Sequence, residues 1–409
     1  MNMGGDAIKT VHKGGPRAPR IMLYSHDTFG LGHLRRSRAL AAAITAADPE
    51  ASALILTGSP VAGRFTFPRR VDHVRLPGVT KRSDGSYASQ TIGMGIEEVT
   101  DLRSGLICTT ARQYEPDVLI VDKEPTGFRG ELLPTLETLQ NEGKTKLVLG
   151  LRDVLDEPEV LAAEWERKDA VTATERFYHE IWVYGLRSIY DPTAGLPLSA
   201  DAQARMHWTG YLRREANVDG KPPQQPYVLI TPGGGGDGKA MVDLVLSAYE
   251  KDPELAPRAV LVYGPFLSGE LREDFETRVE ALNGRVTAVG FESQIETIFK
   301  GAQGVICMGG YNTFCEVLSF DKPAVIVPRT TPRLEQWLRA SRAEDLGLVR
   351  MLDETRDGLT PDTMIQAIRG LATQPKPSQA ISSGLLDGLD YVTRRVNALL
   401  TNKTEQAAQ

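Results

Sequence analysis

The sequence predicts an α/β protein of two similar halves, each built on a parallel β-sheet with helices on both faces. Short apolar runs bounded by Gly, Pro or Asp alternate with longer segments of helix-forming residues through most of the chain. The apolar runs are unbroken, as is typical of strands buried on both faces of a parallel sheet. The alternation stops at a proline-rich segment and then starts again. A chain of 409 residues has room for two such domains at roughly 150 residues each.

The first half is predicted to span residues 20–215, after a polar, Gly-rich leader at 1–19 that we expect to be disordered. Its first strand, 20–25 (RIMLYS), ends in the turn HDTFGLGH, and a helix begins at the last residue of that turn, His33. The later apolar runs predict strands at 53–57, 71–76, 118–121, 146–150 and 181–184. Helices are predicted at 96–113, 128–140 and 158–178.

The break at 216–226 (ANVDGKPPQQP) has three prolines and no apolar periodicity, so it is predicted to be a linker. The second half follows at 227–375. Its predicted strands are 227–230, 259–262, 286–289, 304–307 and 324–327, and its predicted helices are 239–251, 270–282, 292–299, 313–319 and 333–345. A C-terminal segment at 376–402 contains an amphipathic helix, predicted at about 379–401, that we expect to cross back onto the first half, with a tail at 403–409.

Composition and charge exclude several classes of protein. The 47 Lys and Arg against 53 Asp and Glu give a net charge of −6, which argues against a nucleic-acid binder. No apolar stretch approaches the ~18–20 residues of a membrane span. Three cysteines are too few for a disulfide framework. We therefore expect a reduced, cytoplasmic chain whose glycines mark turns and close backbone approaches.

The first Gly-rich turn, which contains Gly30 and Gly32, stands between a strand and a helix, where backbone N–H groups can point at a ligand. It fails as a dinucleotide fingerprint because Arg35 occupies the third glycine position. His33 is placed at the carboxyl edge of the sheet, where open α/β folds bind ligands, and histidine is suited to general-base catalysis near neutral pH. A histidine that only hydrogen-bonds the turn is the alternative. His26 is a weaker candidate on the same turn.

A second Gly-rich turn, 231–240 (TPGGGGDGKA), opens the helix after the first strand of the second half. Its glycines can hold a phosphate on backbone amides and the helix dipole, and the candidates are Gly233, Gly234 and Gly235. The spacing also approaches a Walker A loop, but Ala240 stands where that loop needs Ser or Thr for magnesium. A purely structural turn is the other alternative.

The third segment is 307–316 (CMGGYNTFCE), where a strand ends in Gly309 and Gly310. One interpretation is a capping box in which Thr313 begins a helix and Glu316 closes it. The other is that the Gly pair lets a diphosphate or ribose approach, with the Glu316 carboxylate accepting hydrogen bonds from a ribose diol. The next crevice of this half adds three residues able to meet the same ligand, which are Arg329, Glu335 and Gln336.

Together these segments resemble the two-domain GT-B glycosyltransferases, in particular a predicted-glycosyltransferase branch of the MurG-like family 28 group. The resemblance implies two Rossmann-like domains that face a cleft. The turn that ends at His33 resembles the Gly-rich loop of the family's N-terminal domain, although it lacks the double-Gly form. In the second half, the matches are the Gly-rich loop 233–236, the Gly-x-x-Thr-x-x-Glu helix start (Gly310, Thr313, Glu316), the Gln-x-x-x-Ala element (Gln336, Ala340) and the base-contacting segment 289–292.

By resemblance, the second domain would bind a nucleotide-sugar donor, most simply a UDP-sugar, as a substrate and without a further cofactor. Glu316 would hold the ribose, Phe291 would flank the base, and the glycines would lie near the diphosphate. His33 would deprotonate an acceptor hydroxyl, with Arg329 or Lys239 stabilising the leaving group. The chain has no Asp-x-Asp triplet, so the expected route is metal-independent and, by resemblance, inverting. The acceptor would be a small molecule, a polysaccharide or a lipid-linked sugar.

Acidic and basic residues end two strands of the first half in VDKEP and LRDVLD. They could line the acceptor pocket or form surface turns, and the candidates carried forward are Asp122 and Arg152. Other activities remain open at this point: a sugar-nucleotide epimerase or hydrolase of the same fold, a non-catalytic nucleotide-sugar-binding protein, or a P-loop nucleotidase.

One basic stretch, 64–82, contrasts with the acidic whole and contains Phe65 and Phe67. One interpretation is peripheral contact with an anionic membrane that carries a lipid-linked acceptor. A solvated loop or an anionic soluble acceptor explains the same residues.

Overall fold

The computed structural model describes residues 17–26, 31–81, 86–216, 220–234, 236–380 and 383–407. Two sheets dominate these residues. A seven-stranded sheet has the order β3-β2-β1-β6-β7-β8-β9, and a six-stranded sheet has the order β12-β11-β10-β13-β14-β15. Every strand pair in both sheets is parallel. The predicted α/β architecture with two parallel sheets is therefore confirmed.

The first domain holds most of the N-terminal half of the chain. Its strands are β1 (Arg20–Ser25), β2 (Ser52–Thr57), β3 (Val71–Arg75), β6 (Val118–Asp122), β7 (Lys146–Arg152), β8 (Glu180–Tyr184) and β9 (Met206–Trp208), with a separate hairpin of β4 (Val79–Lys81) and β5 (Tyr87–Ser89). Its helices are α1 (Gly32–Ala47), α2 (Ile96–Tyr114), α3 (Leu133–Glu142), α4 (Pro158–Arg167), α5 (Ala170–Phe177) and α6 (Ala200–Ala204).

The second domain repeats the alternation. Its strands are β10 (Tyr227–Thr231), β11 (Arg258–Val262), β12 (Val286–Val289), β13 (Gly304–Cys307), β14 (Ala324–Ile326) and β15 (Arg350–Met351). Its helices are α7 (Lys239–Lys251), α8 (Gly269–Ala281), α9 (Ile295–Gly301), α10 (Tyr311–Ser319), α11 (Glu335–Asp345), α12 (Glu354–Asp357) and α13 (Pro361–Gly370). The chain ends in α14 (Gly388–Ala407).

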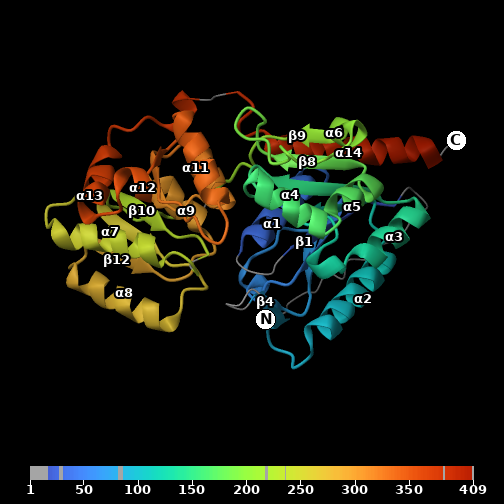
Figure 1. Ribbon diagram of the computed structural model, residues 1–409, viewed down its shortest axis with the longest axis horizontal. Helices are drawn as coiled ribbons and strands as arrows, with labels where there is room; N and C mark the ends of the chain where they lie inside the picture. The colour runs from blue at the N-terminus through green and yellow to red at the C-terminus, as the bar shows by residue number, and fades with distance from the viewer. Residues whose placement is uncertain are drawn as a thin grey trace, which may run out of the picture.

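Helix α14 crosses back to the first domain, as predicted, and lies along it in Figure 1. Its apolar face is buried, with Val392 fully covered and Val396 1% exposed, and it packs against α1. The Arg395 guanidinium pairs with Glu180 at the start of β8. The helix begins later than the sequence predicted. It therefore ties the two halves together after the second domain is complete.

Two predicted helices of the first domain are shorter than the apolar pattern suggested. The segment 158–178 divides into α4 and α5 because Asp169 adopts a left-handed conformation with φ of 50°, which Asp tolerates better than most residues. The segment 128–140 begins with a 3₁₀ turn, and α3 itself begins at Leu133 with a proline in its first turn. No helix of the described residues is long and apolar enough to cross a membrane.

The strand orders fix where a ligand can bind. In each sheet the order reverses beside the first strand of the domain, between β1 and β6 in one and between β10 and β13 in the other. Open parallel sheets bind ligands at this switch point, outside the carboxyl ends of the strands. The segments that follow β1, β6, β10 and β13 therefore begin at the switch points, where this fold binds ligands.

Candidate functional site

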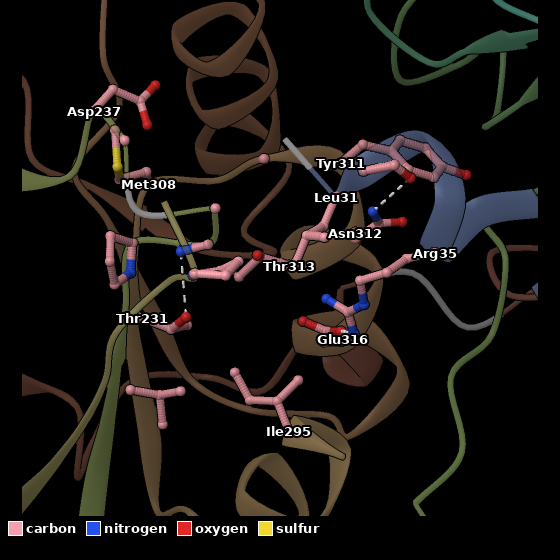
Figure 2. A pocket seen from close by; sticks show the side chains of 18 of the residues that line it. Leu31, Arg35, Thr231, Asp237, Ile295, Met308, Tyr311, Asn312, Thr313 and Glu316 are labelled. Atoms are coloured by element: carbon pink, nitrogen blue, oxygen red, sulfur yellow. Dashed lines mark hydrogen bonds and ion pairs between the residues drawn. The ribbon is translucent and has the colours of Figure 1, made fainter. Parts of the chain in front are cut away.

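A cleft between the two domains collects residues from the segments after β1, β10 and β13, together with residues that follow β2, β11, β12 and β14, and Figure 2 shows it from close by. The predicted site residues that line it are Gly32, His33, Arg152, Gly233, Gly234, Phe291, Gly310, Thr313, Glu316, Arg329, Glu335 and Gln336. Asp122 and Gly309 lie directly behind this lining, each in contact with a residue described below. Gly30 and Gly235 fall outside the described residues. The structure thus brings together candidates that are up to about three hundred positions apart.

On the first-domain side, His33 and Asp122 form a hydrogen-bonded pair. His33 stands in the first turn of α1 and Asp122 ends β6, so the switch point places them together. The His33 Nδ1 atom is 2.5 Å from Asp122 Oδ2. Arg36 Nη2 also lies 3.0 Å from Nδ1, but it is closer to both carboxylate oxygens, at 2.6 Å, and donates to them. A carboxylate only accepts hydrogen bonds, so a hydrogen bond between His33 and Asp122 places the proton on Nδ1 and leaves Nε2 as the nitrogen able to accept one.

Arg36, one helical turn after His33, binds the other side of the same carboxylate. Its Nε donates to Asp122 Oδ1 at 2.9 Å, and its Nη2 lies 2.6 Å from both carboxylate oxygens. The side chain is 1% exposed. Sequence reasoning missed Arg36, because LRRSRA is also an ordinary surface helix pattern; the signal was an arginine at i+3 on the face that carries His33.

The protonation states follow from burial and from these charges. Burial lowers the pKa of His33 to about 4, although Asp122 opposes this by favouring the charged ring. Burial by itself would raise the pKa of Asp122, but Arg36 and His33 outweigh it and hold that pKa below its usual range. At neutral pH the pair is therefore a neutral imidazole oriented by an ionised carboxylate. The pair therefore presents an oriented, unprotonated nitrogen, which is what a general base needs to accept a proton.

On the second-domain side, two glycine-containing turns bring the backbone to the cleft. Gly233 has φ of +80° and its N–H donates to Thr231 Oγ1 at 3.3 Å. Gly309 has φ of +77°, and a Cβ there would lie 2.7 Å from Ile326 Cγ2, so only glycine fits. Gly310 is the N-cap of α10 and has open space where a Cβ would project. The first amides of α10 therefore face the cleft as an anion-binding site.

The capping-box interpretation of Thr313 is wrong. Helix α10 begins two residues earlier than predicted, at Tyr311, and no side chain caps it. Gly310 starts the helix because its backbone adopts an extended conformation with φ of −58° and ψ of 150°. Thr313 and Glu316 consequently lie within the helix, on its cleft-facing side (Figure 2).

Glu316 is 1% exposed and is already engaged by the first domain. The Arg35 guanidinium forms an ion pair with Glu316 and another with Glu296 in α9, the latter at 2.8 Å. Figure 2 shows Arg35 reaching the carboxylate across the cleft. Burial raises the pKa of Glu316 to about 7; Arg35 lowers that pKa and Glu296 raises it. Sequence reasoning used Arg35 only to reject a dinucleotide fingerprint and missed this contact.

The crevice after β14 supplies a further charged group. Arg329 pairs with Asp237 at 2.6 Å and with Glu335 Oε1 at 2.7 Å, and its backbone N–H donates to Gln336 Oε1 at 3.2 Å. Glu335 is 4% exposed, and its Oε2 has no hydrogen-bond partner within the described part of the chain. The three predicted residues are thus joined in one network beside the glycine turn.

Two phenylalanines close one end of the cleft. The Phe65 ring of the first domain meets Phe291 edge to face, with centroids 5.8 Å apart. Phe65 is 6% exposed and Phe67 stacks on His73, so the interpretation that Phe65 touches a membrane is wrong. The Phe65 ring is also covered by Arg38, whose guanidinium carbon lies 4.7 Å from the ring centroid.

A buried ion pair holds the opposite end. Asp153, directly after β7, accepts from Arg339 of α11 at 2.6 and 2.8 Å, and Arg339 also donates to the Gly309 carbonyl at 3.0 Å. Arg339 is fully buried. Asp153 therefore joins the domains instead of lining an acceptor pocket. Arg152 next to it lines the cleft, and its Nε has no hydrogen-bond partner among the residues that the structure describes.

Comparison with known proteins agrees with this geometry. Residues 228–385 match the glycosyltransferase family 28 C-terminal domain. The second domain is a glycosyltransferase family 28 C-terminal domain. The cleft-lining segments after β10, β13 and β14 all lie within that domain. The predicted resemblance to the family 28 group is thereby confirmed.

Curated relatives cover part of the chain. An "Uncharacterized glycosyltransferase" of Methanosarcina acetivorans is 26% identical over 207 residues, which are 48% of this chain and 51% of that protein. The UDP-N-acetylglucosamine--N-acetylmuramyl-(pentapeptide) pyrophosphoryl-undecaprenol N-acetylglucosamine transferase of Mycobacterium tuberculosis is 28% identical over 213 residues, 51% of this chain and 50% of that enzyme. The chain thus spans about half the length of the curated relatives it matches.

Solved structures extend the likeness to both domains. MurG of Acinetobacter baumannii superposes with a TM-score of 0.56 at 13% identity, over 93% of this chain and 99% of MurG. The calicheamicin glycosyltransferase CalG4 gives 0.57 at 16% identity, over 96% and 100%. Phytolacca americana UGT2, solved with UDP-2-fluoro-glucose and pterostilbene, gives 0.62 at 13% identity, over 93% and 100%. The family 28 domain therefore belongs to a chain with the GT-B fold of these enzymes.

Proposed function

We propose that the protein is a glycosyltransferase that moves a sugar from a nucleotide donor to an acceptor hydroxyl. The observation that carries the proposal is the oriented His33–Asp122 pair, which faces the glycine turn and the N-terminus of α10 across one cleft. A base on one wall and an anion-binding wall opposite are what transfer from a sugar diphosphate requires.

The acceptor would be activated from the first-domain side. His33 Nε2 takes the proton of the acceptor hydroxyl as its oxygen forms a bond to the anomeric carbon of the donor sugar. The bond from that carbon to the diphosphate oxygen breaks, and its electron pair leaves with the nucleoside diphosphate. The new positive charge on the imidazole is stabilised by Asp122 at 2.5 Å. A single displacement of this kind inverts the anomeric centre.

The leaving diphosphate would be stabilised from the second-domain side. Backbone amides at the first turn of α10 would donate to its oxygens, and the Arg329 guanidinium would add positive charge, as would Arg152 from the first domain. These groups carry the stabilisation in our proposal, so we expect turnover that does not require a metal ion. Glu316 would then hold the ribose and Phe291 the base.

For the donor and the acceptor, the names of the relatives guide the proposal. The mycobacterial relative is named as a UDP-N-acetylglucosamine transferase, and UGT2 was solved with UDP-2-fluoro-glucose, so we propose a UDP-sugar. The same mycobacterial name describes a lipid-linked acceptor. We therefore propose a cytoplasmic protein that meets such an acceptor at the membrane surface. Small-molecule and polysaccharide acceptors are the alternatives, and the test below includes both.

The test is incubation of the full chain with UDP-sugars and acceptors, without added metal and with a chelator, followed by quantification of UDP and product. We expect glycoside and UDP in equal amounts, and loss of both in His33→Ala. The matched control is His179→Ala, which removes an exposed histidine of the first domain outside the cleft. UDP without glycoside would mean a hydrolase, and an altered sugar with its diphosphate bond intact an epimerase. Binding without turnover would mean a non-catalytic protein, and each of these three results contradicts the proposal.

A further inference from the structure

A second groove lies on the other side of α1, between that helix, α14 and the segment 213–215 that leaves the first domain. It has a cavity volume of about 880 Å³, within the range of small-molecule sites. The floor of this groove is apolar, because the outward face of α1 carries a row of alanines that includes Ala43. Leu386 and Leu389 lie opposite this row. We call it the α1–α14 groove.

Arginines line the wall of the α1–α14 groove at three positions besides Arg35, which is held by Glu296 and Glu316. Arg214 is 7% exposed, donates from Nη2 to Asn312 at 2.7 Å, and has no partner for its Nε within the described residues. Arg38 donates to the Thr66 carbonyl at 2.8 Å and likewise has an unpartnered Nε. Arg213 is exposed.

The positive charge of the α1–α14 groove is only partly neutralised. The acidic groups that line it are Glu215, Glu296 and Asp390, and no ion pair between them and Arg38, Arg213 or Arg214 is present among the described residues. Burial lowers the pKa of Arg38; Glu296 raises it, and the neighbouring Arg35 and Arg214 lower it. A buried guanidinium such as that of Arg214 is normally hydrogen-bonded through its donors, and an anion is the strongest acceptor for them.

We propose that the α1–α14 groove binds a small molecule that carries a phosphate group on an apolar chain or ring. The phosphate would sit against the guanidinium groups of Arg38, Arg213 and Arg214, since planar guanidinium groups match phosphate oxygens. The apolar part would lie on the alanine face of α1 and against Leu386 and Leu389. An uncharged or cationic ligand would leave the arginine donors unpaired, and a bare phosphate would leave the apolar floor uncovered.

Calorimetric titration of the full chain tests this with octyl phosphate below its micelle concentration, inorganic phosphate, and octyl glucoside as the uncharged control. We expect one octyl phosphate per chain, held at least about tenfold more tightly than inorganic phosphate because the alkyl chain is buried. Octyl glucoside should not bind. Absence of octyl phosphate binding, or equal binding of octyl glucoside, overturns the proposal.

Variants locate the binding. Ala43→Trp fills the floor, and Arg213→Glu reverses an exposed charge that the fold does not need; each should weaken octyl phosphate at least about tenfold. Arg187→Glu is the matched control, with a side chain 73% exposed away from the groove. Gly310→Leu fills the interdomain cleft, where a Cβ meets nothing within 4 Å, and should leave the affinity unchanged. The reverse pattern would mean that octyl phosphate binds in the cleft, and the proposal would be wrong.

Vesicles of phosphatidylcholine with and without phosphatidic acid distinguish the two sources of such a phosphate. Binding that needs phosphatidic acid and is lost in Arg213→Glu identifies a membrane lipid as the source. Binding confined to monomeric octyl phosphate identifies a soluble phosphorylated compound. Either result supports the shared chemistry, and neither depends on sugar transfer, so failure of the proposed glycosyltransferase activity is recognised separately.

Discussion

The two walls of the cleft are built from different parts of the polypeptide. The first-domain wall relies on side-chain charges, with His33 and Arg36 both bound to Asp122. The second-domain wall adds backbone to its charged residues, with positive-φ glycines and the open amides of α10. A wall made of charges is set by pairing and burial, whereas a wall made of amides is set by conformation. Substitutions in the first-domain wall should therefore act through charge pairing, and substitutions at the glycines of the second-domain wall should act through backbone conformation.

The largest loss of activity is expected when the His33–Asp122 pair of the first-domain wall is disrupted. Asp122→Asn should lower kcat for sugar transfer by about 10³-fold, because the amide no longer fixes the His33 tautomer or stabilises the imidazolium. The KM for the donor should change little, since the donor lies on the other wall. Initial-rate kinetics of UDP release measure both quantities.

Asp101→Asn, an exposed acid on α2, is the control for Asp122→Asn and should leave kcat unchanged. A loss in KM alone would show that Asp122 serves binding, and the division of labour between the walls would not hold.

The second prediction concerns stability, and it tests the ion pairs by which Arg35 joins the two walls. Arg35→Ala leaves the buried Glu316 carboxylate without its cation beside the partly exposed Glu296, which should cost about 3 kcal/mol of unfolding free energy at pH 8. The cost should shrink at pH 5, below the raised pKa of about 7 of Glu316, because the protonated carboxyl needs no cation. Denaturant unfolding at the two pH values measures it.

The double variant Arg35→Ala/Glu316→Gln should recover part of this stability at pH 8 and lose the pH dependence. An equal cost of Arg35→Ala at both pH values would show that the side chain acts by packing alone.

Two neighbouring glycines test the backbone wall. Gly309→Ala forces a side chain onto a φ of +77° and against Ile326, and should cost about 1–3 kcal/mol together with weaker UDP binding. Gly310→Ala has φ of −58° and open space, so it should be nearly neutral in stability. Thermal unfolding with and without UDP compares the pair. Equal effects of the two substitutions would mean that conformation does not define this wall.

The smallest change is expected in the dependence of kcat on pH. Because the pKa of His33 is lowered to about 4, the base stays neutral and kcat should be nearly constant from about pH 5.5 to 8. The rate should fall only as the pH drops through about 4, where the ring becomes protonated. Because Glu316 has a pKa raised to about 7, the profile is compared with that of Glu316→Gln. An acid limb near the ordinary histidine pKa of about 6.5 that persists in this variant would show that burial does not control His33.

The sequence predicted the backbone wall better than the charged wall, and the reason is physical. A strand followed by clustered glycines is a local pattern, so the segments at 231–240 and 307–316 could be recognised individually. The partners of His33 and Glu316 are not local: Asp122 and Arg35 reach them only through strand order and domain packing. Phe65 was assigned to the surface because nothing near it in sequence shows that Phe291 would meet it.

The buried pair of Asp153 and Arg339 has a mechanical consequence. It sits where β7 faces α11, at one end of the cleft, while Phe65 and Phe291 meet at the far end, beyond β2 and β12. Separating two desolvated charges costs far more than parting two rings in edge contact. We expect the charged end to act as the pivot and the aromatic end as the mouth. When the cleft opens, distances between spin labels on the 62–65 turn and α8 should then increase far more than distances between labels on α4 and α11.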